Sequence, residues 1–248
     1  MPRNATTKST APRNTGKGAE KGAERPVPGF KALEPRARLT DLAYETLEEA
    51  IVTLKLPPGT AISEQTLADM TGIGRTPVRE AIQRLAREHL IIILPQRGLL
   101  ITDVVVSRQL LVLETRRELE RLICVSAAKR ATPAQRQRFV ELAEEFRRLA
   151  QHEDSDAFMQ ADRDFNEECL AAARNPFTEG AMRSLHGLSR RFWFIHYKQS
   201  PDLPKMAELH ASVSDAIARA DVQGAGQGLD QLIDFIEQYT RSAVLPDG

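Results

Sequence analysis

The sequence has only two cysteines among its 248 residues, and Cys124 and Cys169 do not form a C-x-x-C pair. This scarcity argues against a disulfide scaffold and a zinc–thiolate site, and both thiols fit their helical surroundings as small core residues. No apolar run approaches the ~18–20 residues that span a bilayer. The N-terminus also lacks the apolar segment of a secretory signal. We therefore expect a cytoplasmic protein that has no membrane partner.

The sequence also lacks a net charge: its 34 Lys and Arg residues balance its 34 Asp and Glu residues. The balance hides an asymmetry, since residues 1–38 contain nine Lys and Arg but three Glu, a net charge of +6. These residues include almost no large apolar side chains, so we expect residues 1–38 to form a disordered basic tail. Such a tail could hold nucleic acid without reading its sequence, or it could be a solubilising segment without contacts.

Residues 39–103 follow the pattern of three helices and a hairpin. Apolar residues at helical spacing predict a first helix over about 40–54, and Ser63 is a good cap for a short second helix. Thr76-Pro77 is a typical start for a third helix. Two β-type runs within 90–102, separated by a turn signal, then predict a hairpin. This order of elements predicts a winged helix-turn-helix domain.

Residues 104–248 show helical periodicity only. Cap and proline signals divide them into six to seven helices, and no strand or glycine-rich phosphate loop interrupts them. The expected fold class is therefore mainly α: a winged helix-turn-helix domain at 39–103, then an all-α bundle at 104–248. No nucleophile–base pair or complete metal set is present in the sequence, so we do not expect an enzyme.

The third predicted helix carries Arg75 and Arg79 on one face, opposite its apolar stripe. In a helix-turn-helix, the first residues of the recognition helix reach base edges in the major groove, where an arginine fork can bind guanine. Arg97, at the predicted hairpin tip, is placed to reach the DNA backbone or the minor groove. On periodicity alone, an ordinary solvated face shared with Glu80 and Glu88 stays an alternative.

The same region closely resembles the GntR family of bacterial transcription regulators. The resemblance rests on about 60 residues with ordered spacing, in the segments Leu54–Gly59, Ser63–Ala68, Gly72–Ala81, Leu85–Leu90 and Arg97-Gly98. It implies that the DNA-contacting positions are Gln65, Arg75, Thr76, Arg79, Arg97 and Gly98. One departure is Gly74, where a serine is common in the family, and the missing hydroxyl removes a candidate phosphate contact.

Residues 107–240 resemble, more loosely, the ligand-sensing FCD domain of the FadR subfamily within that family. The segments that carry this resemblance are Arg116–Glu120, Asp162–Asn166 and Glu208–His210. The resemblance implies a pocket for a small organic acid, because an arginine fork and neighbouring polar groups suit a carboxylate. It also implies that residues 104–248 form the effector-binding and dimerisation domain. The side chains expected to bind this effector are Arg116, Asp162, Asn166 and His210.

In many members of that subfamily, one Asp and three His hold a divalent metal, which takes the carboxylate of the effector. Here Asp162 and His210 match, but Asn166 stands at the first His position and the last falls near Leu232. The histidine set is incomplete, so we expect no cofactor, and Asp162 and His210 are only residual candidate ligands for a divalent metal. Two other histidines could replace the missing ligands if the fold brought them to the site, His186 and His196.

Two interpretations stay open within the helical domain. The aromatic run Phe192-Trp193-Phe194 can belong to the bundle core, to a dimer contact or to the wall of a pocket. His210 can be a hydrogen-bonded core histidine or a ligand contact.

Together, these features predict a sequence-specific, DNA-binding transcription regulator. We expect a repressor, because repression is the commoner outcome in this family, with an operator affinity that changes when an organic acid binds. A homodimer would place two recognition helices one duplex turn apart, so the double-stranded operator should be pseudo-palindromic. The alternative is an effector-independent DNA-binding dimer with a degenerate ligand pocket.

Overall fold

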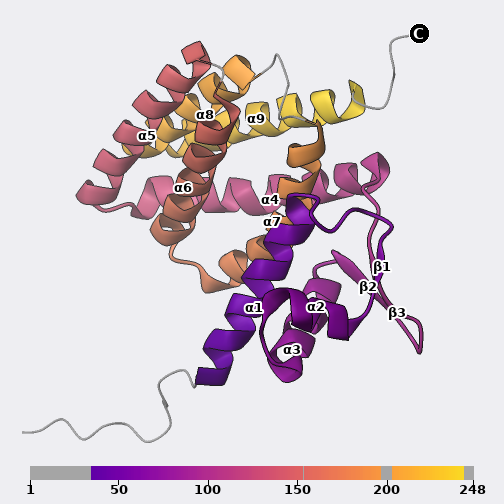
Figure 1. The fold of residues 1–248 in the computed structure, drawn as a ribbon. Coiled ribbons are helices and arrows are strands. Elements are labelled where there is room, and N and C mark those ends of the chain that lie inside the picture. Colours follow the sequence, from indigo (N-terminus) through magenta and orange to yellow (C-terminus); the bar gives the residue numbers. More distant parts are fainter. Residues whose placement is uncertain (1–34, 153, 197–202, 243–248) are drawn as a thin grey trace, which may run out of the picture. The chain divides into compact units, whose positions relative to one another are not determined.

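The computed structural model describes residues 35–152, 154–196 and 203–242. Residues 35–101 contain three helices and three short strands, and the described residues after them form helices only (Figure 1). In chain order the elements are α1 (Pro35–Val52), β1 (Ala61–Ile62), α2 (Glu64–Thr71), α3 (Arg75–Arg87), β2 (Ile91–Leu94), β3 (Gly98–Ile101), α4 (Val106–Arg130), α5 (Pro133–His152), α6 (Ser155–Ala173), α7 (Pro176–His196), α8 (Leu203–Ala218) and α9 (Val222–Ser242).

Local chemistry sets both ends of α2, and its start is the predicted one. The hydroxyl of Ser63 accepts a hydrogen bond from the Thr66 backbone N–H at 3.0 Å, which satisfies one of the free donors at the helix start. The helix ends at Gly72, whose φ of 65° is easy only for glycine. Helix α3 then packs against α1 with Val78 and Ile82 fully buried, so its opposite face is exposed.

The three strands form one antiparallel sheet in the order β1-β3-β2. Strands β2 and β3 make the predicted hairpin, with Leu94 opposite Gly98 at the turn end. At Gly98, φ is 92° and a Cβ atom would lie 2.9 Å from the Ile62 carbonyl oxygen of β1. This position therefore requires glycine to let β1 and β3 pair.

Two helix starts differ from the predicted ones. Helix α1 begins at Pro35, so the last four residues of the predicted tail, 35–38, lie inside this helix, and residues 1–34 lie outside the described part of the chain. Helix α3 begins at Arg75 after Gly74, and Gly74 makes no side-chain cap bond. Thr76 therefore lies in the first turn, and the prediction that the helix starts with Thr76 as its cap and Pro77 as its first residue is wrong.

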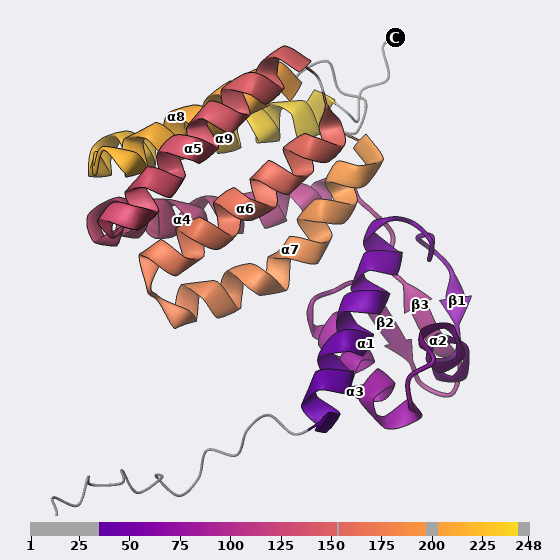
Figure 2. The ribbon, with the colours of Figure 1, turned by 60° about the vertical axis from the view of Figure 1, so that its left-hand side comes forward.

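Helices α4 to α9 form the predicted all-α bundle, with six helices in the described residues. Helix α5 lies alongside α8, and α9 packs against both α8 and α4 (Figure 2). Phenylalanines fill the core between α5 and α6, and Phe139, Phe146 and Phe158 are at most 1% exposed. None of the described helices is both long enough and apolar enough to cross a bilayer.

Candidate functional site

The side chains predicted to read DNA lie on the exposed face of α3. Arg75, Thr76 and Arg79 all point away from the buried stripe of that helix. Arg79 Nε and Nη2 bind Glu64 Oε2 at 3.0 and 2.9 Å, so α2 orients this guanidinium. Arg75 has no hydrogen bond or ion pair with any residue that the structure describes, which leaves its fork open to an outside acceptor.

The remaining predicted DNA contacts lie on α2 and in the β2–β3 turn. Gln65 is exposed, and its amide donates to Asp69 Oδ1 at 2.6 Å. Arg97 is exposed in the turn, next to the half-buried Gly98. The fold therefore gathers all six predicted positions in one domain, and their contact with DNA stays a prediction.

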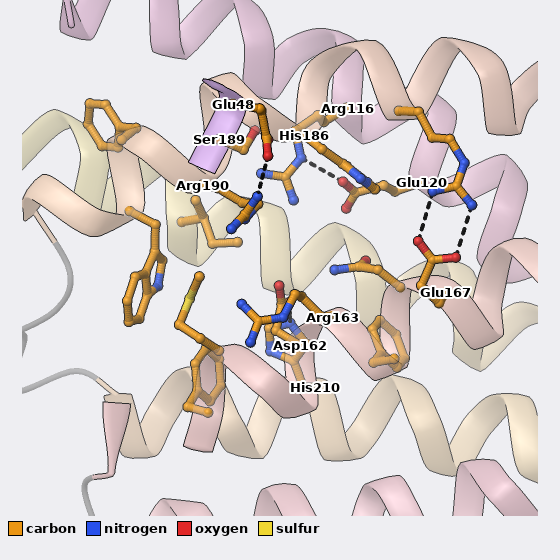
Figure 3. Close-up of a pocket in the computed structure, with 18 of the residues that line it drawn as sticks. Glu48, Arg116, Glu120, Asp162, Arg163, Glu167, His186, Ser189, Arg190 and His210 are labelled. Atoms are coloured by element: carbon orange, nitrogen blue, oxygen red, sulfur yellow. Dashed lines mark hydrogen bonds and ion pairs between the residues drawn. The ribbon is translucent and has the colours of Figure 1, made fainter. Parts of the chain in front are cut away.

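A cavity of about 370 Å³ lies among α4, α6, α7, α8 and α9 (Figure 3). This volume falls within the ~300–1,000 Å³ usual for small-molecule sites. The four side chains predicted to bind an effector all line it: Arg116, Asp162, Asn166 and His210. Side chains of the winged helix-turn-helix domain line it as well, from α1 and α3: Tyr44, Glu45, Glu48 and Arg84.

The imidazole of His210 lies between two hydrogen-bond acceptors. Its Nε2 is 3.1 Å from Asp162 Oδ1 and its Nδ1 is 2.9 Å from the Met206 carbonyl oxygen. Three phenyl rings enclose it, with ring centroids 4.8 to 5.6 Å away, from Phe146, Phe158 and Phe165. His210 is thus a buried, hydrogen-bonded histidine on the cavity wall, and its contact with an effector stays a prediction.

The carboxyl of Asp162 is stabilised in its charged form. Burial alone would raise the pKa of this carboxyl. The hydrogen bond and charge of His210, with the charges of Arg116 and His186, lower the pKa by more than burial raises it, so it lies below the ordinary value. Asp162 is therefore an anion at neutral pH and presents negative charge to the cavity.

We expect the free energy of unfolding of Asp162→Asn to fall less between neutral and acidic pH than that of the parent protein. Because the folded-state pKa of Asp162 is lowered, its charge stabilises the fold above the ordinary aspartate pKa of about 4, and this stabilisation is lost as pH falls through the folded-state value. Urea unfolding at neutral pH and at about pH 3 measures the effect. The two proteins should differ most at neutral pH, and an equal difference at both pH values would contradict this role.

Two further side chains complete the polar lining around Asp162. Arg116 Nε binds Glu120 Oε1 at 2.6 Å, so its charge is already balanced. His186 of α7 lines the cavity, and its burial, together with Arg116, lowers its pKa and favours the neutral form. We did not predict His186 as an effector residue, because no sequence signature marks its helix. The ring of His196 lies 4.4 Å from that of Phe192 at an interplanar angle of 38°, and His196 is not among the residues that line the cavity.

The donor set does not fit the metal centre that the family resemblance implies. Asp162 and His210 bond directly to each other, while Asn166 and Leu232 stand in the lining where imidazoles would be needed. Within the described ranges, no group of three or more His, Cys, Asp or Glu side chains could hold a metal ion. We therefore assign no metal chemistry to this cavity.

Family models match both halves of the chain. The model described as bacterial regulatory proteins, gntR family, matches residues 39–101, and the FCD domain model matches residues 111–235, half of the chain. Among known proteins, the HTH-type transcriptional repressor RspR of Escherichia coli (strain K12) is 22% identical over 209 residues, covering 84% of this chain and 92% of RspR. An HTH-type transcriptional regulator in an unstable DNA locus of Streptomyces ambofaciens is 43% identical over 61 residues, a quarter of this chain and 26% of that protein.

Solved structures agree on the fold. McbR/YncC of E. coli superposes with a TM-score of 0.69 at 19% identity, covering 82% of this chain and 97% of McbR. A GntR transcriptional regulator from Rhodococcus sp. RHA1 gives a TM-score of 0.63 at 21% identity, covering 84% of this chain and all of that one. The arrangement of a small three-stranded domain followed by a helical bundle is therefore shared with both proteins.

Proposed function

Because the chain belongs to the GntR family of bacterial regulatory proteins and carries an FCD domain, we propose that it is a homodimeric repressor that a small organic acid releases from a pseudo-palindromic operator. Its class is that of a transcription regulator with a DNA-binding helix-turn-helix and a ligand-binding helical domain. The observation that carries the proposal is the cavity, whose lining includes side chains from both halves of the chain.

Operator recognition is assigned to α3 and the β2–β3 turn. The exposed fork of Arg75 can take the O6 and N7 atoms of a guanine, a contact worth about 1–3 kcal/mol. Arg79, oriented by Glu64, lies one helical turn further along the same face. Arg97 in the turn and Gln65 on α2 supply flanking contacts to the DNA backbone or grooves.

Effector binding is assigned to the polar lining of the cavity. Arg116 and Asn166 offer polar contacts to the body of the effector, while His210 holds Asp162 in place beside them. A cavity of this size and polarity favours a sensing role over the alternative of a degenerate, effector-independent dimer. The incomplete ligand set favours an effector that binds through protein side chains without a metal.

Selection of bound duplexes from a random library by the full chain tests this function. We expect an inverted repeat with half-site centres about one helical turn, ~10 base pairs, apart. Native mass spectrometry of the selected complex should show two chains per duplex, and the free protein, never exposed to chelator, should carry no divalent metal. A single unrepeated site bound by one chain would contradict the dimeric repressor, and a stoichiometric metal would contradict the proposed mode of effector binding.

A further inference from the structure

Helix α7 connects the cavity to the DNA-binding half. Arg190 Nη1 binds Glu48 Oε2 at 2.8 Å and Arg190 Nη2 binds Glu49 Oε2 at 2.6 Å, both on α1. The next residue, Arg191, donates to the carbonyl and hydroxyl oxygens of Thr102, each at 2.9 Å. These bonds join residues about 90 to 140 positions apart in sequence, so α7 is a main contact between the two halves.

The backbone of α7 also lies close to the same domain. A Cβ atom at Gly187 would lie 2.7 Å from a Leu90 methyl carbon and 3.1 Å from Glu48 Oε1. Leu188 packs against the core of the DNA-binding domain. A change in how Arg190 is held will therefore act directly on the contact between α7 and α1.

The two glutamates that hold Arg190 differ in burial. The Glu48 side chain is 11% exposed, and burial raises its pKa although Arg190 opposes the shift. The Glu49 side chain is 52% exposed, so water can solvate it when it leaves the guanidinium. Glu49 is therefore the partner that a competing carboxylate displaces at lower cost, because the buried Glu48 needs its counter-charge.

Two hydrogen-bonding groups at this wall are unused. Ser189 Oγ and Arg190 Nε are buried, yet neither has a hydrogen-bond partner in the described part of the chain. Both residues line the cavity. Buried polar groups in native proteins usually have partners, so an unpaired hydroxyl beside an unpaired N–H points to an acceptor supplied from outside.

Across the cavity lies another arginine, Arg163, whose side chain is exposed. Figure 3 shows Arg163 with Asp162 and His210 on one side of the space, and Glu48, Ser189 and Arg190 on the other. Arg163 Nη2 donates to Gln160 Oε1 at 2.6 Å, and the guanidinium has no ion pair with a described residue. The cavity thus presents unused donors at two separate ends.

From this arrangement we propose that the effector is a small dicarboxylic acid, with one carboxylate on Arg163 and the other on Ser189 and the Nε–Nη2 edge of Arg190. A carboxylate binds that edge side-on through two parallel hydrogen bonds. It therefore displaces Glu49 from Nη2 and loosens the α7–α1 contact. The inference rests on the proposed function, since it names the effector class and the step that couples the cavity to the DNA-binding half.

Calorimetry on the full chain with matched acids tests the two-ended site. The probes are succinate, glutarate and adipate, each against the monocarboxylate of equal chain length: butyrate, pentanoate and hexanoate. We expect at least one diacid to bind about tenfold tighter than its monoacid, equivalent to about 1.4 kcal/mol. In operator titrations, that diacid should weaken DNA binding by about fivefold or more, the lower end of usual allosteric couplings.

Substitutions at each end of the site distinguish the contributions of the two ends to acid affinity, beginning with Arg190→Lys. Lysine keeps a positive charge facing Glu48 but lacks the planar fork, so diacid affinity should fall about tenfold while monoacid affinity is unchanged. Arg163→Ala should weaken both series. The matched control is Arg241→Lys on α9, because Arg241 also binds a glutamate, Glu237, through Nε and Nη2. If Arg190→Lys does not fold, Ser189→Ala should still lower diacid affinity selectively.

Equal binding of a diacid and its monoacid, or an equal loss of both in Arg190→Lys, would overturn the inference. If a monoacid alone binds and weakens operator binding, the proposed function stands and the two-ended site is wrong. If no acid of either series binds, the dicarboxylate inference is wrong, and the operator selection still decides separately whether the chain is a dimeric DNA-binding protein.

Discussion

Arg75→Ala should abolish sequence-specific operator binding and leave the fold intact. Each lost guanine contact costs about 1–3 kcal/mol, and a dimer loses two of them, so affinity should fall by at least about 30-fold. The side chain is exposed and makes no bond within the described residues, so its removal costs the protein no internal interaction. Gel mobility-shift titration at one salt concentration measures the loss, with non-specific duplex as reference.

Arg219→Ala is the matched control for this experiment. Arg219 lies just after α8 with 66% of its side chain exposed, close to the 65% of Arg79, and among the described residues its side chain pairs only with Asp215. The control should bind the operator like the parent protein, whereas Arg79→Ala should show a loss similar to that of Arg75→Ala. Full operator affinity in Arg75→Ala would contradict the assignment of α3 as the recognition helix.

Phe146→Ala should destabilise the helical domain by about 3–5 kcal/mol. The ring is completely buried and lies 5.8 to 6.0 Å from the rings of Phe158 and Phe165, with the imidazole of His210 stacked on it. Its loss leaves a cavity that helices α5, α6 and α8 cannot easily close, because each contributes a rigid aromatic side chain to the same cluster. Urea unfolding followed by circular dichroism measures the change in free energy.

Val140→Ala on the same helix is the control, since Val140 is 37% exposed and its loss should cost well under 1 kcal/mol. Phe146→Leu should lie between the two, because leucine keeps much of the buried apolar surface. A cost below about 1 kcal/mol for Phe146→Ala would mean that the aromatic cluster is not a tightly packed core.

The parts of the fold that were predictable from sequence are those with local causes. Ser63 starts α2 as predicted, because capping involves residues only three positions apart. Strand β1 was not predicted, since its two residues carry no periodicity and owe their conformation to pairing with Leu99 and Leu100. Thr76-Pro77 is a strong local start signal, yet α3 begins one residue earlier, at Arg75, with Gly74 as its N-cap. The exact first residue of this helix therefore did not follow from the local signal.

The candidate site divides in the same way. All four side chains predicted to bind the effector line the cavity, because the family segments that carry them lie on the helices that enclose it. From sequence, His186 was only a conditional replacement for a metal ligand, and Arg190 was not assigned to the cavity. They lie on α7, which has no recognisable signature, and Arg190 reaches Glu48, 142 positions away. Only the packing of α7 against α1 brings such residues together.

The place of Trp193 has a practical consequence. It is the only tryptophan in the sequence, it lines the cavity, and its indole stacks on Phe158 with ring centroids 6.2 Å apart. Intrinsic emission excited at the red edge of the protein absorption band therefore arises from one fluorophore at the ligand site. The unlabelled protein thus contains its own optical probe, whose intensity and emission maximum will change when a molecule enters the cavity and replaces water around the indole.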